Sequence, residues 1–268
     1  DIASKAEADD RLILELSSFQ LMGTDAFKPH IAAITNIYAA HLDYHGSMDG
    51  YISAKWHITA NQTADDFLIL NADQMDVFGD RATKATVVPF SATTIQPDGA
   101  WFDQDSQNFM WHDEIVFNRK DFFLQGHHNL ENMLVAVAIG KLLRISNEEI
   151  KNGVSAFHGV KHRLQFVAEI DGRRFYNDSK ATNNDASITA LDSFSQKHDN
   201  VIWLAGGLDR GNEVTELADH MDRVKGMVVF GQAADKFADL GQSQGLTEIE
   251  KVEWIEEAVK AAFDMSAP

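Results

Sequence analysis

The chain has 268 residues, of which 44% are hydrophobic, and its formal net charge is -18 at pH 7. A chain of this length can bury two modest cores, so we expect a globular protein with two domains. The negative charge opposes a general attraction to nucleic acid or to anionic lipid, and the absence of cysteine excludes disulfides and thiolate metal sites. No apolar run reaches the roughly 18 residues of a membrane-spanning helix, and the first residues lack the features of a secretory signal. These features favour a cytoplasmic protein.

The first predicted strand covers residues 12–16, an apolar run that Glu15 interrupts. A short run of this kind is typical of a strand that is buried on both faces of a sheet. Because burying an unpaired carboxylate costs several kcal/mol, Glu15 should be neutralised, paired with an arginine, used as a helix cap or bound to a cation.

A second strand is predicted over residues 30–36, and His41, Asp43 and His45 follow it. Ligands collect at the carboxyl ends of parallel strands, so we expect Glu15 and His41 to share one edge of the sheet. An acid at that edge can hold Mg²⁺ beside a phosphate site. A polar loop packed on itself is the alternative for the three residues after the second strand.

A helix is predicted next, with Ser47 as its N-cap and with Tyr51, Ile52 and Ile58 on one face. Lys55 lies three or four residues from each of these side chains. A helical lysine is ordinarily a solvated surface charge, but partial burial would lower its pKa and favour the free amine. A free amine can react with carbon dioxide, and a carbamylated Lys55 would be a carboxylate able to join a metal site.

The middle of the chain predicts more sheet and then two helices. Strands are expected at 67–71 and 86–90, hairpin strands at 99–102 and 114–117, and helices at 128–142 and 146–157. Asn129 and Asn132 lie one turn apart on the first of these helices, where their amides could contact a base. Helix capping is the alternative for Asn129. A linker at 157–160 divides the chain into domains 1–159 and 160–268.

The second domain alternates strands with helices, which predicts a mainly parallel sheet. Its strands are expected at 165–171, 173–177, 201–205 and 224–230, and its helices around 188–194, 233–240 and 255–263. The loop 177–183 follows a strand and concentrates a cation, hydroxyls and backbone donors, which suits an anion, with a surface turn as the alternative.

The glycine-rich loop 206–211 also follows a strand, but its glycine spacing differs from the dinucleotide fingerprint, so no nicotinamide cofactor is expected. The chain begins without Met and stops after a helix where a strand usually follows. We therefore expect a fragment or a processed product.

Taken together, these segments resemble the Mur ligase family over nearly the whole chain. The segments that carry the resemblance are 15–21, 35–43 with Ala54 and Lys55, 128–132, 162–165 and 177–183. The resemblance implies a P-loop-type central ATPase domain over 1–159 and a Rossmann-like C-terminal domain over 160–268. Both domains are expected to be incomplete, because the chain holds no G-x-x-x-x-G-K-[ST] loop and lacks the family's UDP-binding N-terminal domain and its final segment.

The resemblance also implies a role for each candidate site residue. The expected Mg²⁺ ligands are Glu15 for one ion and His41 with carbamylated Lys55 for a second. The expected ATP contacts are Asn129, Asn132, Arg163 and Asp178. The expected contacts to the nucleotide-sugar substrate are Ser17 and Gln20, and those to the incoming amino acid and the acyl phosphate are Lys180, Thr182 and Arg210.

The activity that the resemblance implies is that of the family members which add D-glutamate to UDP-N-acetylmuramoyl-L-alanine in peptidoglycan synthesis. ATP would phosphorylate the alanyl carboxylate, and the amine of D-glutamate would displace phosphate, with two Mg²⁺ ions and a hinge at 158–161. We expect a cytoplasmic monomer that contacts neither nucleic acid nor membrane, and we expect this chain alone to be inactive. The alternatives are another Mur or folylpolyglutamate-type ligase, or a non-catalytic fragment that keeps the fold.

Overall fold

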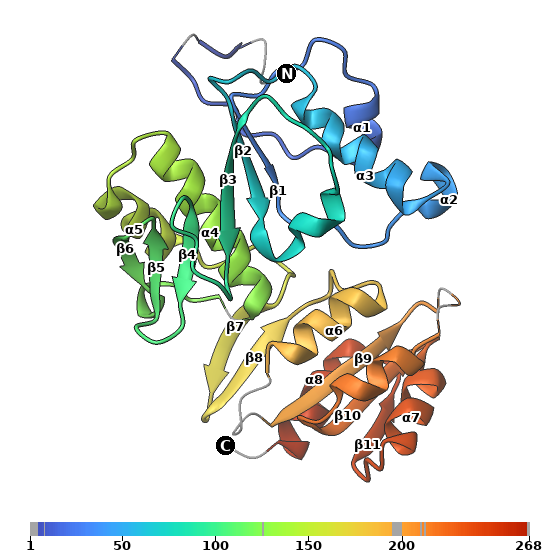
Figure 1. The fold of residues 1–268 in the computed structure, drawn as a ribbon. Coiled ribbons are helices and arrows are strands. Elements are labelled where there is room, and N and C mark those ends of the chain that lie inside the picture. The colour runs from blue at the N-terminus through green and yellow to red at the C-terminus, as the bar shows by residue number, and fades with distance from the viewer. Residues whose placement is uncertain are drawn as a thin grey trace. The chain divides into compact units, whose positions relative to one another are not determined.

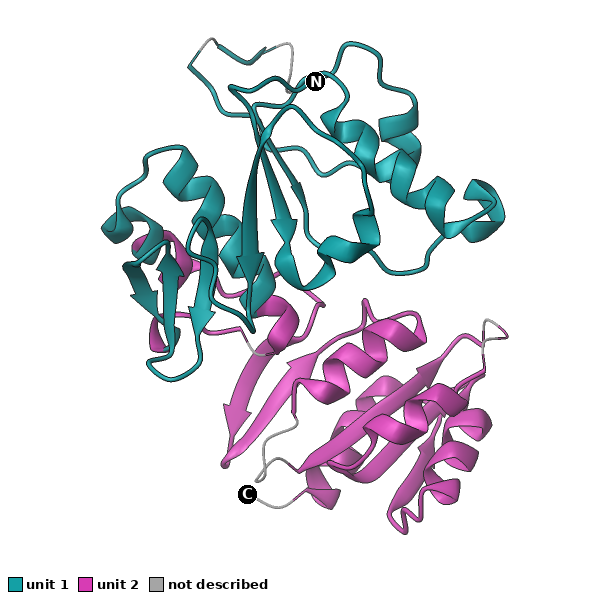
Figure 2. Ribbon diagram, viewed as in Figure 1, with its two compact units in different colours: residues 1–119, 130–151 teal, residues 120–129, 152–268 magenta. Residues whose placement is uncertain are grey.

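The computed structural model describes residues 5–7, 9–124, 126–194, 200–209, 211 and 213–266, which fold into two compact units (Figure 1, Figure 2). Unit 1 comprises residues 1–119 and 130–151, and unit 2 comprises residues 120–129 and 152–268. Helices α4 (His127–Leu142) and α5 (Asn147–Ala156) each contribute residues to both units. Within the described residues, no helix is both long enough and apolar enough to cross a membrane.

Unit 1 is built on a six-stranded sheet in the order β1-β2-β3-β4-β5-β6. The first four strands pair in parallel, and β5 and β6 are antiparallel to their neighbours. The strands are β1 (Ile31–Ile34), β2 (Phe67–Asn71), β3 (Thr86–Ser91), β4 (Ala100–Asp103), β5 (Asn108–Trp111) and β6 (Glu114–Asn118). The shorter helices are α1 (Ser18–Met22), α2 (Leu42–His45) and α3 (Met48–Trp56), with 3-10 turns at His57–Thr59, Ala72–Phe78 and Arg119–Asp121.

The core of unit 1 lies on β2, the second strand of this sheet. Leu68, Ile69 and Leu70 are 0%, 0% and 1% exposed; β1 and β3 flank the strand, and α3 packs on the face that carries Leu68 and Leu70. Tyr51 and Ile52 of α3 belong to the same apolar cluster as Leu68 and Leu70, so they fix α3 to the sheet. Truncating a buried leucine such as Leu68 to Ala would lower the free energy of unfolding by about 2–5 kcal/mol.

The predicted strand at 12–16 is wrong. This segment has no regular structure, and Leu12, Ile13 and Leu14 are 50%, 89% and 60% exposed. A strand buried on both faces needs a neighbour that accepts its backbone hydrogen bonds, and in the described sheet β1 is the end strand, paired with β2 alone. Glu15 is accordingly exposed, not buried.

Unit 2 contains two sheets. A hairpin pairs β7 (Gln165–Ile170) with β8 (Arg173–Asn177) in antiparallel fashion, and a parallel sheet has the order β11-β10-β9. Its strands are β9 (Val201–Gly207), β10 (Val224–Gly231) and β11 (Ile249–Val252), and the helices of the unit are α6 (Asn184–Asp192), α7 (Ala234–Ser243) and α8 (Ile255–Met265), with a 3-10 turn at Thr215–His220. Both units confirm the predicted mixed α/β fold with mainly parallel pairing.

Strand β10 is the centre of unit 2. Met227, Val228 and Val229 are each 0% exposed. Side chains of a strand alternate between faces, so Met227 and Val229 join a cluster with Leu240 of α7, whereas Val228 packs against Ala258 of α8. Covering both faces in this way is what allows an almost purely apolar strand.

Asp66 ties together the amino ends of β1 and β2. Its carboxylate accepts hydrogen bonds from the backbone N–H of Thr63 at 2.7 Å and from Nδ1 of His30 at 3.1 Å, and Nζ of Lys28 lies 3.1 Å away. Burial alone would raise the pKa of Asp66, but these donors and the Thr63 hydroxyl outweigh it and hold the pKa well below the ordinary 3.8.

Replacing Asp66 with Asn is expected to destabilise unit 1 by about 2 kcal/mol at neutral pH, because it removes charge-assisted hydrogen bonds. Since the pKa of Asp66 is lowered by folding, the stabilisation is present above 3.8 and is lost as pH falls below that value. Urea unfolding at several pH values should show the difference between wild type and D66N narrowing in acid. The matched control is D65N, at the exposed neighbouring position; equal losses in the two variants would contradict this account.

Candidate functional site

Three short helices of unit 1 and their caps carry four of the residues predicted to bind metal and substrate. Ser17 and Gln20 lie at the start of α1, His41 is the N-cap of α2, and Lys55 is in the last turn of α3. Figure 1 shows α2 and α3 following one another in the chain, and α3 contacts both α1 and α2. The predicted N-cap of α3 is confirmed, because the hydroxyl of Ser47 accepts a hydrogen bond from the N–H of Gly50 at 3.0 Å.

Lys55 is half-buried beside Tyr51, with Nζ 5.9 Å from the centroid of the tyrosine ring. Burial lowers the pKa of Lys55, and the negative charge of Glu15 offsets part of this effect by raising it. The prediction that packing lowers the pKa of this lysine is confirmed. The charge of Glu15 thus acts on Lys55, although Glu15 lies in an irregular segment and not in a strand.

His41 adopts a left-handed backbone conformation, with φ of 53°. Its ring meets the ring of Phe19 edge-on, with 5.0 Å between centroids. We had expected Glu15 and His41 to converge from two consecutive strands. This expectation is wrong, because Glu15 lies in an irregular segment. In the part of the chain that the structure describes, no group of three or more His, Asp or Glu side chains is arranged to hold a metal ion.

Ser17 and Gln20 form a capping box at the start of α1. The N–H of Ser17 donates to Oε1 of Gln20 at 2.8 Å, and the N–H of Gln20 donates to the Ser17 hydroxyl at 3.2 Å. Both residues are exposed. Polar atoms of both side chains therefore cap the amino end of α1, and any substrate contact must compete with or extend this pairing.

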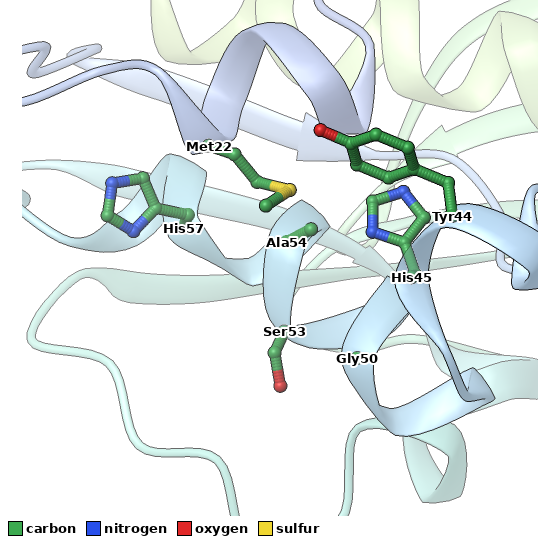
Figure 3. A pocket seen from close by; sticks show the side chains of 7 residues that line it. All are labelled: Met22, Tyr44, His45, Gly50, Ser53, Ala54 and His57. Carbon is green, nitrogen blue, oxygen red and sulfur yellow. The ribbon is translucent and has the colours of Figure 1, made fainter.

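A pocket of about 400 Å³ opens between these helices. Figure 3 shows Tyr44 and His45 side by side at one end of it, His57 at the other and Met22 between them. The full lining is Met22, Tyr44, His45, Gly50, Ser53, Ala54 and His57. Sequence reasoning did not assign this pocket, although Gly50, Ser53, Ala54 and His57 recur at three- and four-residue intervals, which marks one face of a helix.

In unit 2, Arg163 lies in a strained loop that Asp178 holds. His162 and Leu164, which flank Arg163, have φ of 66° and 40°, a region that such residues rarely adopt. The N–H of Leu164 donates to Oδ1 of Asp178 at 2.7 Å, and the N–H of Lys180 donates to the carbonyl of His162 at 3.0 Å. Two hydrogen bonds thus join the loops 162–164 and 177–180.

The charges around this loop interact. Burial raises the pKa of Asp178, while the Leu164 hydrogen bond and the charge of Arg163 partly offset it. Burial also lowers the pKa of His128, and the charges of Arg163 and His127 lower it further. The charge of Arg163 therefore acts on both Asp178 and His128, and Asn129 is next to His128 in the chain. His128 received no role from the sequence, although it precedes Asn129 in a segment that had been singled out.

The remaining candidates are placed as follows. Helix α4 begins at His127, so Asn129 lies inside its first turn and is not its N-cap, and Asn132 is exposed one turn further along. Lys180 and Thr182 are exposed in the loop that precedes α6, which Asn183 caps by accepting from the N–H of Ala186 at 2.9 Å. Arg210 lies outside the described residues.

Comparison with protein families matches both halves of the chain. Residues 2–140 match the Mur ligase middle domain, and residues 162–268 match the Mur ligase glutamate ligase domain. A UDP-N-acetylmuramoylalanine--D-glutamate ligase of Listeria monocytogenes is 48% identical over 100% of this chain and 58% of its own length. A relative of the same name from Macrococcus caseolyticus is 52% identical over 88% of this chain and 52% of its own length. The chain thus spans little more than half the length of these relatives.

Solved structures show the same fold at low sequence identity. The UDP-N-acetylmuramate-alanine ligase MurC of Thermotoga maritima has a TM-score of 0.65 and 19% identity, covering 91% of this chain and 55% of its own. The MurF ligase of Thermotoga maritima, solved in complex with ADP, has a TM-score of 0.59 and 14% identity, covering 89% of this chain and 61% of its own. Folylpolyglutamate synthase of Thermotoga maritima also has a TM-score of 0.59 and 14% identity, covering 87% of this chain and 55% of its own.

Replacing Glu15 with Gln is expected to lower the pKa of Lys55 further, because the substitution removes the charge that favours the ammonium form. An alkaline NMR titration of the Lys55 side chain measures this pKa directly. The control is D49N, which removes an exposed acid of α3 that is paired with Arg81. An identical Lys55 titration in wild type and E15Q would rule out the proximity of Glu15 and Lys55.

Proposed function

The chain belongs to the Mur ligase family, and we propose on that premise that it is part of an ATP-dependent ligase which adds D-glutamate to UDP-N-acetylmuramoyl-L-alanine. The observation that carries this proposal is the 48% identity, over all 268 residues, to a relative named for that reaction. Likeness to the folylpolyglutamate synthase is a likeness of fold at 14% identity and does not favour that alternative.

In this proposal the two domains have different tasks. Residues 1–159 form a central ATPase domain of the P-loop type, without the P-loop itself, and residues 160–268 form a Rossmann-like C-terminal domain that handles the amino acid. The extent of the two family-model matches supports this division. ATP is bound by Asn129, Asn132, Arg163 and Asp178. The hydrogen bonds between loops 162–164 and 177–180 support this assignment, because they fix the backbone on the carboxyl and amino sides of Arg163 next to Asp178.

The proposed reaction joins a carboxylate to an amine in two steps. The alanyl carboxylate oxygen attacks the γ-phosphorus of ATP, the bond to the bridging oxygen breaks and ADP leaves. The amine of D-glutamate then attacks the acyl carbon, and phosphate leaves with the electrons of the C–O bond as the amine gives up a proton. Ser17 and Gln20 contact the nucleotide-sugar, and Lys180, Thr182 and Arg210 contact D-glutamate and the acyl phosphate.

Two Mg²⁺ ions are proposed as cofactors, with Glu15 as a ligand of one and His41 and carbamylated Lys55 as ligands of the other. The donor types fit, because Glu15 is a carboxylate, His41 is an imidazole, and a carbamate on Lys55 would add a second carboxylate. When bound, such ions offset the negative charge of the phosphates. We further propose a cytoplasmic monomer that acts on soluble substrates, without nucleic acid or membrane.

The 268-residue chain alone is expected to show no turnover, because it holds no G-x-x-x-x-G-K-[ST] loop to hold the phosphates of ATP. A coupled phosphate-release assay with ATP, Mg²⁺, D-glutamate and UDP-N-acetylmuramoyl-L-alanine measures this. Turnover above the rate without enzyme would contradict the expectation.

A chimera tests the function itself. When residues 1–268 replace the matching segment of the Listeria monocytogenes relative, phosphate release should depend on D-glutamate and not on other amino acids. K55A in this chimera should reduce the rate by about 100-fold or more, the size typical of losing a group that stabilises transition-state charge. The control is K84A, at an exposed lysine of unit 1. A folded chimera that prefers another amino acid, or that tolerates K55A as well as K84A, would refute the proposal.

A further inference from the structure

His45 is the centre of an aromatic cluster that links the three short helices of unit 1, and no role has been assigned to it so far. Its ring stacks on Phe19 of α1, with 5.3 Å between centroids and 28° between planes. It also lies 5.1 Å from the ring of Tyr44 and 5.4 Å from that of Tyr51. Nε2 of His45 is 3.0 Å from the hydroxyl of Ser18, which is itself 2% exposed.

Each of the two proposed ligands of one metal ion rests on a ring that contacts His45. On one side, Phe19 meets the ring of His41 at 5.0 Å. On the other side, the ring of Tyr51 lies 5.9 Å from Nζ of Lys55. A continuous series of contacts therefore runs from His41 through Phe19, His45 and Tyr51 to Lys55.

The backbone of α2 makes these contacts necessary. The helix has only four residues, and both of its caps, His41 and Gly46, have left-handed φ values of 53° and 74°. A non-glycine residue in this region costs on the order of 1 kcal/mol or more and persists only where its surroundings hold it. Since so short a helix is not stable alone, contacts with neighbouring elements must hold it, and the packing of His45 at its carboxyl end is one of them.

We propose that His45 is a positioning residue: it holds His41 through Phe19 and Lys55 through Tyr51, and thereby sets the spacing of two ligands for a shared divalent cation. The metal part of this inference rests on the proposed function. The positioning part rests on the ring contacts, so the two parts can fail separately.

The test uses the 268-residue chain and NMR of its aromatic side chains. H45L fills the space without an aromatic ring, H45F restores the ring, and S18A removes only the hydrogen bond to Nε2. The matched control is H112L, because His112 also has a left-handed backbone, with φ of 53°, and contacts a ring, that of Trp111, outside the cluster.

In H45L, the ring resonances of His41 and Tyr51 should shift toward their positions in the urea-unfolded chain, while the rest of the spectrum stays folded. S18A should shift the same resonances by a smaller amount, H45F should restore them, and H112L should leave them unchanged. Unchanged His41 and Tyr51 resonances in either H45L or S18A, whichever folds, overturn the proposal, as does an equal shift in H112L.

A titration with Mn²⁺ in bicarbonate buffer tests the metal part. Mn²⁺ should broaden the His41 resonances of the wild type, and H45L should weaken this binding by about tenfold to 100-fold, the usual effect of removing a group that orients a metal ligand. If the rings respond to H45L but Mn²⁺ does not broaden His41 in the wild type, the proposed metal site fails and the positioning role stands. Equal Mn²⁺ affinity in wild type and H45L overturns the proposed effect of His45 on metal binding.

Discussion

The packing of α3 against the parallel sheet is the constraint on which the site in unit 1 depends. Tyr51 and Ile52 join the apolar cluster of β1 and β2, and this burial fixes the rotation of the helix about its axis. Lys55, one turn beyond Tyr51, is therefore only partly solvated, and this burial lowers its pKa. The same tyrosine ring contacts His45, so a single buried side chain links the sheet, the lysine and the aromatic cluster around α2.

Several non-glycine residues of the chain have a left-handed backbone, and three of them are candidate site residues or lie beside one. His41, His162 and Leu164 all have positive φ, and each lies in a segment that sequence reasoning associates with ligands. His41 packs against the ring of Phe19, whereas the loop 162–164 is hydrogen-bonded through the carboxylate of Asp178 and the carbonyl of His162. Left-handed conformations of non-glycine residues are unfavourable, and favourable contacts with surrounding residues must offset this free-energy cost. Such conformations cluster at sites where side chains are oriented for a ligand.

Some elements could be predicted from residues alone and others could not, for reasons of local chemistry. Strands β2 and β10 were predictable because continuous apolar runs such as Leu68-Ile69-Leu70 have no stable place except between two covered faces. Strands β5 and β11 were missed. Their sequences, residues 108–111 and 249–252, are short and mix polar or charged residues with apolar ones, so pairing with a neighbour decides their structure more than their own pattern does. The pocket beside Ser53 and His57 was missed because small and polar residues on a helix resemble an ordinary solvated face.

Local patterns were sufficient to establish the α/β class, the cap at Ser47, the burial of Lys55 beside Tyr51 and the family to which the segments belong. Each of these depends on residues close together in the chain, where helical or strand spacing brings side chains together. The state of residues 12–16 and the aromatic cluster around His45 depended instead on which distant segments pack nearby. Burial and strand pairing are properties of neighbours in space, and an apolar run without a paired neighbour stays irregular and exposed.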